Sequence, residues 1–264
     1  MFFIQSNLPV VVGFRDQMLG IKVLIIDNNV QLMRLVNEIL SEAGAEVMTA
    51  RDGLDGISKL ITHQPDMVFI NIMMSEKEGL QVFKKVRQLT TIPIIMLSTE
   101  NNEELLLQSL EAGADDFLSK PFSPEVMLAR ARSVLRRGER SNELPAVLEY
   151  DDGYLKIDVE RHCALVNDRQ VKLTPVEFRL LVFLASNAGK VLSFEEILDH
   201  IWGKRYIGND DYVHVYISHL RKKIEQDTKN PRYILTVHGV GYLFEKQNEP
   251  TTVGKTVHGR SNGR

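Results

Sequence analysis

Polar residues that could bind a charged group stand at the ends of several short apolar runs in the first half of the chain. They supply one carboxylate, two amides, one hydroxyl and one ammonium group, at Asp27, Asn28, Asn71, Ser98 and Lys120. The apolar runs have the composition of buried parallel strands. Ligands bind beyond the carboxyl ends of such strands. We therefore expect these side chains to meet in one crevice, where Lys120 is the natural counter-charge of Asp27.

The segments around these residues alternate between two hydrophobic periods. Strands are predicted at 22–27, 46–50, 66–71, 93–97 and 115–119, and helices at 30–43, 53–61, 80–89, 103–111 and 124–137. Five strand–helix units in the length of one domain predict an α/β fold with a parallel sheet covered on both faces.

A second kind of chemistry is predicted in a basic helix at 211–226. Its apolar residues give it a core face, and Arg221, Lys222 and Lys223 stand beside hydroxyl and imidazole donors. This combination suits insertion into a DNA groove.

The elements around the basic helix differ from those of the first half. Short alternating stretches at 147–150, 154–159 and 163–166 predict a small antiparallel sheet. Thr174, Pro175 and Glu177 form a capping box that opens a helix, and Ser193 with Glu196 opens another. Strands at 233–237 and 242–245 predict a hairpin. A sheet, three helices and a terminal hairpin describe a winged helix-turn-helix.

Length and composition limit the possible classes of protein. The chain has 264 residues and a net charge of -3, so we expect two domains and a local basic patch for any DNA binding. The single cysteine, Cys163, indicates a reducing compartment such as the cytoplasm. No apolar run is long enough to cross a bilayer. We predict a disordered extension at 1–20 with Met18 as a plausible start, a first domain at 21–137, a linker at 138–145, a second domain at 146–245 and a disordered tail at 246–264.

The motifs VLIIDNN, PDMVFINIMMSEKEGLQVFKKVR, IPIIMLST and EAGADDFLSKPFSP closely resemble a response-regulator receiver domain over residues 21–137. In that family an acidic pair and a third-strand aspartate hold a magnesium ion. The resemblance implies that a partner kinase phosphorylates this aspartate, and that a Ser or Thr and a Lys contact the phosphoryl oxygens.

The chain departs from this pattern where the phosphoryl group would bind. Asn71 occupies the acceptor position and Asn28 replaces the second residue of the acidic pair, so that only Asp27, Ser98 and Lys120 match. An amide is a poor nucleophile, and magnesium prefers carboxylate oxygens. We therefore predict a pocket without aspartyl phosphorylation or bound metal, which puts a partner histidine kinase in doubt.

One alternative is that the two asparagines are incidental and that another group is phosphorylated. Asp66, Ser75 and Ser98 are the candidates, although none is at the acceptor position. Phe117 matches the switch aromatic of the family. Without a phosphoryl group, something else must set its state, such as dimerisation, protein level, a ligand or a partner.

The resemblance also implies a dimer face formed by the fourth helix, fifth strand and fifth helix. Leu106 and Val126 replace an ion pair that is usual there, and the remaining charged candidates are Asp115, Asp116 and Arg130. Burial of a leucine is worth about 1.5–3 kcal/mol, against about 0–1 kcal/mol for an exposed ion pair. The substitution could favour a homodimer that needs no phosphorylation. Alternatively, leucines of this helix pack into their own domain, which we expect of Leu107 and Leu110.

The motifs LTPVEFRLLVFLASNAGKVLSFEEILDHIWG, VHVYISHLRKKIE and ILTVHGVGYLFE closely resemble the DNA-binding domain of the OmpR/PhoB class over residues 146–245. The resemblance implies double-stranded DNA as a partner, with half-sites arranged as direct repeats. The predicted DNA-binding residues are Trp202, His214, Tyr216, Ser218, His219, Arg221, Lys222, Lys223, Thr236 and His238.

Different roles are expected within this set. Tyr216, Ser218 and His219 are the best candidates to approach base edges, whereas the basic residues contact phosphates. His238 on the wing stands where the family often has arginine. Trp202 contacts the DNA backbone or belongs to the core.

The loop at 203–210 matches the segment that touches RNA polymerase in activators of the class. Lys204, Arg205 and Tyr206 are its exposed candidates, and a passive loop is the alternative.

We therefore interpret the chain as a dimeric transcription regulator of two-component type, with no cofactor and no need of phosphorylation. The rival interpretation is a signalling adaptor whose receiver-like domain binds a partner protein or a small ligand. An enzyme is not expected, because the sequence has no P-loop, no metal-ligand cluster and no nucleophile–base motif.

Overall fold

The computed structural model describes residues 17–74, 78–99, 103–139 and 149–247. The first half contains one parallel sheet with the strand order β2-β1-β3-β4-β5. Its strands are β1 (Lys22–Ile26), β2 (Glu46–Ala50), β3 (Met67–Asn71), β4 (Ile94–Ser98) and β5 (Asp116–Ser119).

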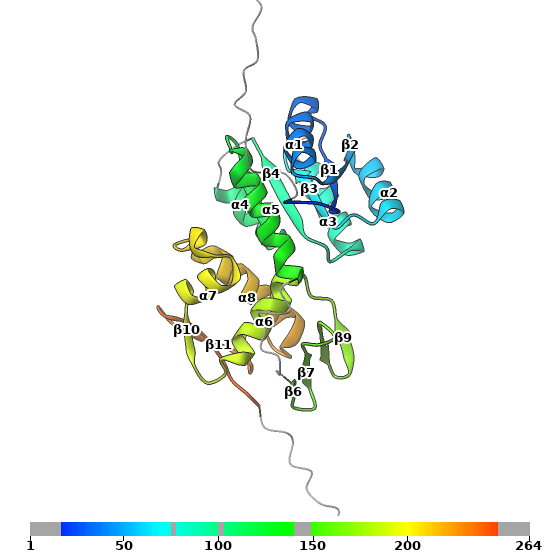
Figure 1. The fold of residues 1–264 in the computed structure, drawn as a ribbon. Coiled ribbons are helices and arrows are strands. Elements are labelled where there is room, and N and C mark those ends of the chain that lie inside the picture. The colour runs from blue at the N-terminus through cyan, green and yellow to red at the C-terminus, as the bar shows by residue number, and fades with distance from the viewer. Residues whose placement is uncertain (1–16, 75–77, 100–102, 140–148, 248–264) are drawn as a thin grey trace, which may run out of the picture.

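Helices cover both faces of this sheet (Figure 1). They are α1 (Val30–Glu42), α2 (Gly53–His63), α3 (Glu78–Leu89), α4 (Glu103–Glu111) and α5 (Pro124–Glu139). Alternate residues of β1 point to opposite faces. Val23 and Ile25 pack with α1 and α5, whereas Leu24 and Ile26 pack with α2, α3 and α4. The predicted doubly wound parallel sheet is confirmed.

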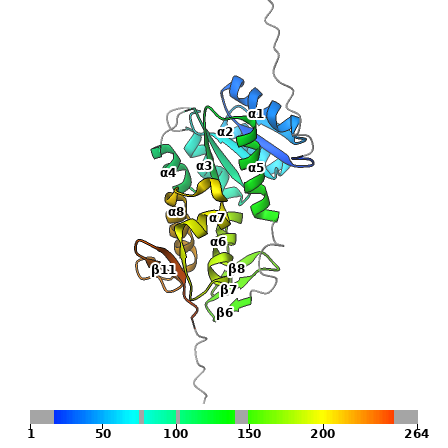
Figure 2. The same cartoon turned by 60° about the vertical axis from the view of Figure 1, so that its left-hand side comes forward.

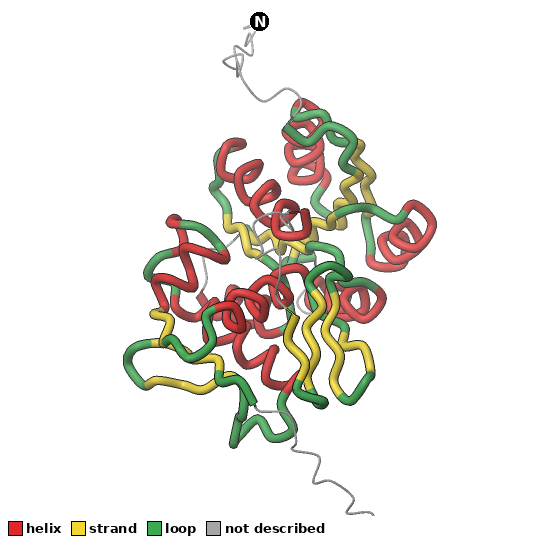
Figure 3. Tube along the Cα trace, turned by 60° about the horizontal axis from the view of Figure 1, so that its bottom comes forward, coloured by secondary structure: helices red, strands yellow, loops and turns green. Residues whose placement is uncertain are grey.

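The second half begins with an antiparallel sheet of β6 (Glu149–Asp151), β7 (Leu155–Asp158), β8 (Cys163–Val166) and β9 (Arg169–Val171). Three helices follow, α6 (Pro175–Ser186), α7 (Phe194–Ile201) and α8 (Asp210–Ile224), with a short 3-10 turn η2 (Lys204–Tyr206) between the last two. The predicted capping boxes of α6 and α7 are both present. A second antiparallel sheet, ordered β10-β12-β11, joins β10 (Val191–Ser193) to the wing strands β11 (Ile234–Val237) and β12 (Gly241–Phe244). Figure 3 shows the strands of the second half in yellow, apart from the strands of the parallel sheet. The predicted winged helix-turn-helix is confirmed.

The two halves pack directly against each other. Helix α4 lies on α8 and α5 lies on α6, and the turned view shows α7 and α8 beneath the receiver-like half (Figure 2). Helix α5 runs to Glu139, past the start of the predicted linker at 138–145.

The predicted disordered ends are too long. Residues 17–20 form a turn. Met18 is buried in the core beside α1, and its backbone N–H donates to the Ala43 carbonyl. At the other end, the Gln247 backbone N–H donates to the Tyr150 hydroxyl at 3.0 Å. Residues 1–16 and 248–264 lie outside the described residues.

Candidate functional site

The carboxyl ends of β1, β3 and β4 bring the predicted pocket residues together. Asp27 is fully buried after β1, and Asn71 is buried at the end of β3. The Asn71 side-chain amide donates to Asp27 Oδ1 at 2.8 Å, and the Asn29 backbone N–H donates to the same oxygen at 2.8 Å. The Asn71 side-chain oxygen accepts from the Met73 backbone N–H at 3.0 Å. Both ends of the Asn71 amide are therefore engaged within the pocket.

In the described part of the chain, the charged groups that interact in the pocket are the Asp27 carboxylate and the Lys120 ammonium group. Burial raises the pKa of Asp27, although the Asn71 and Asn29 hydrogen bonds and the Lys120 charge act in the opposite direction. Asp27 Oδ2 has no hydrogen-bond partner among the described residues. Ser98 is fully buried at the end of β4, and Phe117 is buried in β5.

The donor set fits a magnesium ion poorly. Among the described residues, Asp27 alone brings a carboxylate into hydrogen-bond contact with Asn71. The Asn28 amide nitrogen donates to the Met74 carbonyl and the Asn71 amide nitrogen to Asp27, so these groups present N–H donors. Magnesium requires oxygen ligands in a near-octahedral arrangement.

The alternative phosphorylation candidates lie in different places. The Asp66 carboxylate accepts from the Lys22 backbone N–H at the opposite end of the sheet, away from Asn71. Ser98 is fully buried, and Ser75 lies outside the described residues.

Helix α8 has three faces with different environments. Its core face includes Val213, Ile217, Leu220 and Ile224, all buried. A second line, His214, Ser218 and Lys222, recurs every four residues and is exposed. The third face carries Tyr212, Tyr216, His219 and Lys223 and lies toward the receiver-like half or α6.

The predicted phosphate contacts are not equivalent. Lys222 is exposed. Arg221 instead donates to the Ile234 carbonyl and to the Thr236 hydroxyl, at 2.6 and 2.8 Å, and so ties α8 to the wing strand β11. Lys223 forms an ion pair of 2.6 Å with Glu177, whose side chain is 3% exposed. Sequence reasoning identified Glu177 only as a helix cap and missed this second role.

The wing extends the exposed line of α8. His238 is exposed in the turn between β11 and β12, and Thr236 is exposed on β11. The His214 ring nitrogen Nδ1 lies 2.9 Å from the Tyr242 hydroxyl on β12. The exposed surface of the second half thus joins His214, Ser218 and Lys222 to the wing.

Trp202 belongs to the core in this conformation. It is 3% exposed, and its ring centroid lies 5.1 Å from that of Tyr216 and 5.8 Å from that of Tyr212. Its indole N–H has no hydrogen-bond partner among the described residues.

The buried carboxylate of Asp116 joins the two halves. Asp116 is fully buried on β5 and accepts hydrogen bonds from Arg130 at 2.7 Å and from the Tyr212 hydroxyl at 3.1 Å. It also accepts a short hydrogen bond from the Tyr206 hydroxyl. Burial raises the pKa of Tyr212 well above its ordinary value, and the Asp116 charge raises it further. Tyr212 therefore acts as a neutral donor.

Two predicted base-reading residues contact the receiver-like half directly. The Tyr216 hydroxyl donates to the Ala114 carbonyl at 2.6 Å, and His219 Nε2 lies 3.0 Å from the Glu111 carbonyl oxygen. Tyr216 is 1% exposed. This arrangement, which we call the closed conformation, leaves Ser218 as the exposed member of the three residues predicted to approach base edges.

In a comparison with known proteins, each half of the chain matches a family model. Residues 23–132 match the model of the response regulator receiver domain, and residues 168–244 match that of the transcriptional regulatory protein, C terminal. The chain is 40% identical over 233 residues to the probable transcriptional regulator ycf27 of Porphyridium aerugineum, a match that covers 86% of this chain and 97% of the relative. It is 36% identical over 239 residues to the alkaline phosphatase synthesis transcriptional regulatory protein PhoP of Bacillus subtilis (strain 168), covering 86% and 99% of the two chains.

This chain belongs to the OmpR/PhoB class of response regulators. A solved structure of a RitR mutant has the same fold, with a TM-score of 0.68, 24% identity and coverage of 86% of this chain and 100% of that chain. In the described residues of this response regulator, no helix is both long and apolar enough to cross a membrane.

Four of the five residues predicted to form a dimer face of this response regulator, all except Asp115, lie at or beside the contact between its own domains. Leu106 packs against the hydrophobic clusters of both halves. Asp115 was expected on the surface, but it is fully buried and pairs with Arg87 at 2.6 Å inside the receiver domain. Val126 is 37% exposed. The expectation that Leu110 packs only into its own domain is wrong, because it joins the core cluster of the DNA-binding domain.

The loop of this response regulator that was expected to touch RNA polymerase is only partly exposed. Lys204 and Arg205 are exposed. Tyr206, predicted to be exposed, is 6% exposed because its ring packs at the domain contact and its hydroxyl donates to Asp116.

Proposed function

We propose that this response regulator binds DNA in a sequence-specific way without aspartyl phosphorylation. The observation that carries the proposal is the hydrogen bond of 2.8 Å from the Asn71 amide to Asp27. At the position where the family has its acceptor aspartate, the chain has a neutral amide that already donates to the Asp27 carboxylate. An acyl phosphate cannot form on an amide, so the receiver domain has lost the acceptor chemistry.

DNA binding is proposed to use α8 and the wing. His214, Ser218 and Lys222 present donors along one exposed line that His238 extends. Charge favours contact with phosphates mainly through Lys222, so the affinity of one domain is expected to be modest and steeply dependent on salt. Two copies on paired half-sites would raise the affinity through effective concentration. Lys204 and Arg205 are the exposed residues that could reach RNA polymerase.

The closed conformation has to open for full DNA recognition. Tyr216 and His219 are the predicted base-reading residues that it covers, and Leu106 of the proposed dimer face is covered as well. A form in which α8 leaves α4 and β5 would expose both surfaces together. The signal that drives opening must therefore bind or stabilise the open form more strongly than the closed one.

The experiment compares the wild type with Asn71→Asp and with the double variant Asn28→Asp/Asn71→Asp, each incubated with acetyl phosphate and magnesium. Intact mass spectrometry, light scattering and thermal unfolding are recorded. We expect no hydroxylamine-sensitive phosphoryl group on the wild type and no change in its oligomeric state. The double variant restores an acidic cluster, so magnesium should raise its melting temperature while leaving that of the wild type unchanged.

The proposal fails if wild-type protein gains a hydroxylamine-sensitive phosphoryl group, or if it dimerises only after acetyl phosphate is added. The adaptor hypothesis is not favoured, because the winged helix-turn-helix is complete and has an exposed polar line. Selection of a preferred duplex from randomised DNA tests this point directly, and failure to enrich any sequence would contradict the DNA-binding part of the proposal.

A further inference from the structure

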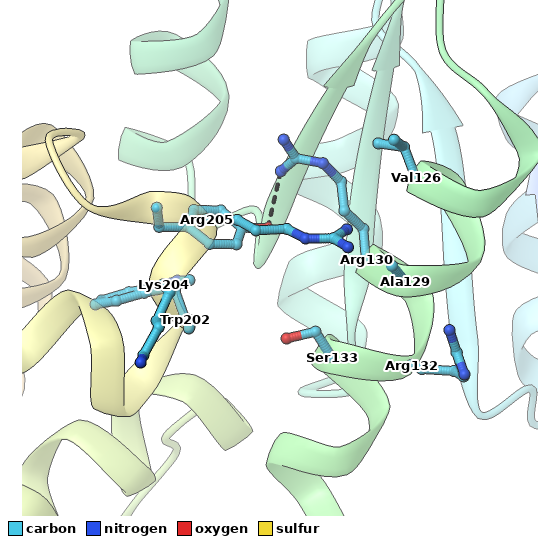
Figure 4. Close-up of a pocket in the computed structure, with 10 residues that line it drawn as sticks. Val126, Ala129, Arg130, Arg132, Ser133, Trp202, Lys204 and Arg205 are labelled. Atoms are coloured by element: carbon cyan, nitrogen blue, oxygen red, sulfur yellow. Dashed lines mark hydrogen bonds between the residues drawn. The ribbon is translucent and has the colours of Figure 1, made fainter.

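A cavity of about 450 Å³ lies between the two domains of this chain. One wall is the segment 126–133 of α5 in the receiver domain. The other wall is the segment 202–206, from the end of α7 through the turn η2 (Figure 4). Small-molecule sites in proteins typically measure roughly 300–1,000 Å³. The size of the cavity therefore suits a compact ligand.

The side chains around this cavity are strongly cationic. Arg130 and Arg132 come from α5, and Lys204 and Arg205 come from the turn, whereas no acidic residue of the described chain lines the cavity. Figure 4 shows Arg205 extending from its turn toward α5 and Arg130 extending from α5 to its hydrogen bond with Tyr206. Each domain thus directs a guanidinium group into the space between the domains.

Only one of these cations has a carboxylate partner in the described part of the chain. Arg130 pairs with Asp116. No described carboxylate lies within ion-pair distance of Arg132, Lys204 or Arg205. A neighbouring cavity of about 690 Å³ has both signs of charge, because Glu103 and Asp211 line it together with Arg130 and Arg205. The first cavity therefore has an excess of positive charge that this neighbouring cavity lacks.

Apolar surface completes the walls of the cationic cavity. Val126 and Ala129 line it from α5, and the rings of Trp202 and Tyr206 line it from the other domain. An anion with an apolar or planar portion would contact these side chains while its charged groups meet the guanidinium groups, which recognise phosphate through paired N–H donors.

We propose that this cavity binds a small organic phosphate that carries at least two negative charges, and that the bound ligand holds the chain in the closed conformation. Cations from both domains face the ligand only when the domains are in contact. Separation of the domains would leave the ligand with the cations of one wall. The ligand therefore has a higher affinity for the closed form, and by linkage it shifts the equilibrium toward that form.

The consequence for DNA rests on the proposed function, in which α8 must leave the receiver domain. At a free ligand concentration 100 times its dissociation constant for the closed form, the ratio of closed to open molecules would rise by up to about 100-fold. DNA affinity would fall by up to the same factor. The chain has no acceptor aspartate, so this ligand would be a chemical signal that acts without phosphorylation. The signal would be inhibitory, because the bound ligand would lower the affinity for DNA.

The test uses the full chain, pyrophosphate and uridine diphosphate. Trp202 is the only tryptophan and lies in the cavity wall against the α8 tyrosines, so its emission reports on both the cavity and the domain contact. We expect saturable changes in emission and calorimetric heat with one site per chain. Sulfate at matched ionic strength should not reproduce them. The variants Arg205→Gln and Lys204→Gln should weaken binding at least tenfold.

Matched controls are Arg169→Gln and Lys229→Gln, which remove exposed charges of the same kind outside the cavity. The proposed site is overturned if neither phosphate binds saturably, or if the control variants weaken binding as much as the cavity variants. The regulatory part is overturned if the phosphates bind but leave the affinity for a selected duplex unchanged. Wild-type protein that binds the phosphates but no DNA at all would contradict the proposed function and still support the phosphate site in the cavity.

Discussion

The substitution Asp116→Asn is predicted to favour the open conformation. Asp116 is fully buried, and its carboxylate accepts from Tyr206 and Tyr212 of the DNA-binding domain. Its bonds with Arg130 and with the Phe117 backbone N–H are internal to the receiver domain. Those two bonds do not cross the domain contact, so we expect opening to leave them in place and to break only the two tyrosine bonds.

The magnitude follows from the change of acceptor. A hydrogen bond to a charged group contributes about 1.5–3 kcal/mol, whereas a neutral pair contributes about 0.5–1.5 kcal/mol. Asparagine loses the charge, and because Tyr206 and Tyr212 donate to different carboxylate oxygens, one of the two hydroxyls then faces the amide nitrogen and can only accept from it. For two tyrosine hydroxyls the closed form should lose about 1–3 kcal/mol, which corresponds to a change of about 5- to 150-fold in the ratio of closed to open molecules.

The assay measures opening and DNA binding separately. X-ray scattering should show a larger radius of gyration for the Asp116→Asn variant without DNA, and Trp202 emission should change as the α8 tyrosines leave the receiver domain. Fluorescence anisotropy with a selected duplex should show tighter binding, since apparent affinity rises with the fraction of the competent form. Tyr212→Phe should act in the same direction with a smaller effect, and should add little in the Asp116→Asn background.

The neighbouring residue supplies the matched control. Asp115 is equally buried, but its carboxylate pairs with Arg87 and accepts from the Ile94 backbone N–H within the receiver domain. Asp115→Asn should lower the stability of that domain without changing the domain contact. If the Asp116→Asn and Asp115→Asn variants show the same radius of gyration and the same DNA affinity as the wild type, the assignment of Asp116 as the joint between the domains is refuted.

Three further outcomes are expected. Burial lowers the pKa of His219 in the closed form despite the nearby Glu177 charge, so closure should be strongest above the ordinary histidine pKa of about 6.5 and should weaken as pH falls below it. X-ray scattering between pH 5.5 and 8 measures this, and the prediction is contradicted if the radius of gyration of the wild type stays constant over this range, as that of His219→Gln should. Lys223→Met should lower thermal stability by leaving the buried Glu177 carboxylate unpaired, whereas Lys222→Met should leave the melting temperature unchanged and reduce the salt dependence of DNA binding by about one phosphate contact. Gly241→Ala should destabilise the DNA-binding domain severely, because a Cβ atom there would overlap the Leu192 carbonyl oxygen; a normal thermal melt of that variant would contradict the β10–β12 register.

Sequence reasoning located most elements because their local signals agree with the fold. The capping boxes at Thr174 and Ser193 indicated the starts of α6 and α7, and hydrophobic period predicted all five parallel strands. Two strands were missed. Residues 169–171 and 191–193 are three-residue strands, too short for a period to emerge, and they form only because a partner strand lies beside them.

The receiver pocket was predictable because its residues follow strand ends, which topology brings together. The environment of the basic helix was not predictable in the same way. Arg221 and Lys223 look like phosphate contacts in the sequence, yet their partners are the Ile234 carbonyl, 13 positions away, and Glu177, 46 positions away. The domain contact at Asp116 joins residues 90 and 96 positions apart, and no local pattern indicates such a pairing.

The buried position of Leu106 changes the meaning of its apolar character. A leucine in place of a charged residue was expected to favour pairing between two chains, but in the closed form the same side chain packs against the DNA-binding domain of its own chain. If the proposed dimer uses this face, closure and dimerisation compete for one surface. Closure is intramolecular and independent of protein concentration, whereas dimerisation gains from mass action. DNA binding should then rise with concentration more steeply than dimerisation alone would give, since each pairing event also frees two α8 helices. Leu106→Ala should weaken both closure and dimerisation, whereas Asp116→Asn should weaken closure alone, so the two variants together separate the two contributions. Dimer dissociation constants of both variants, measured by light scattering, would show whether the Leu106 side chain stabilises the closed form or the dimer more.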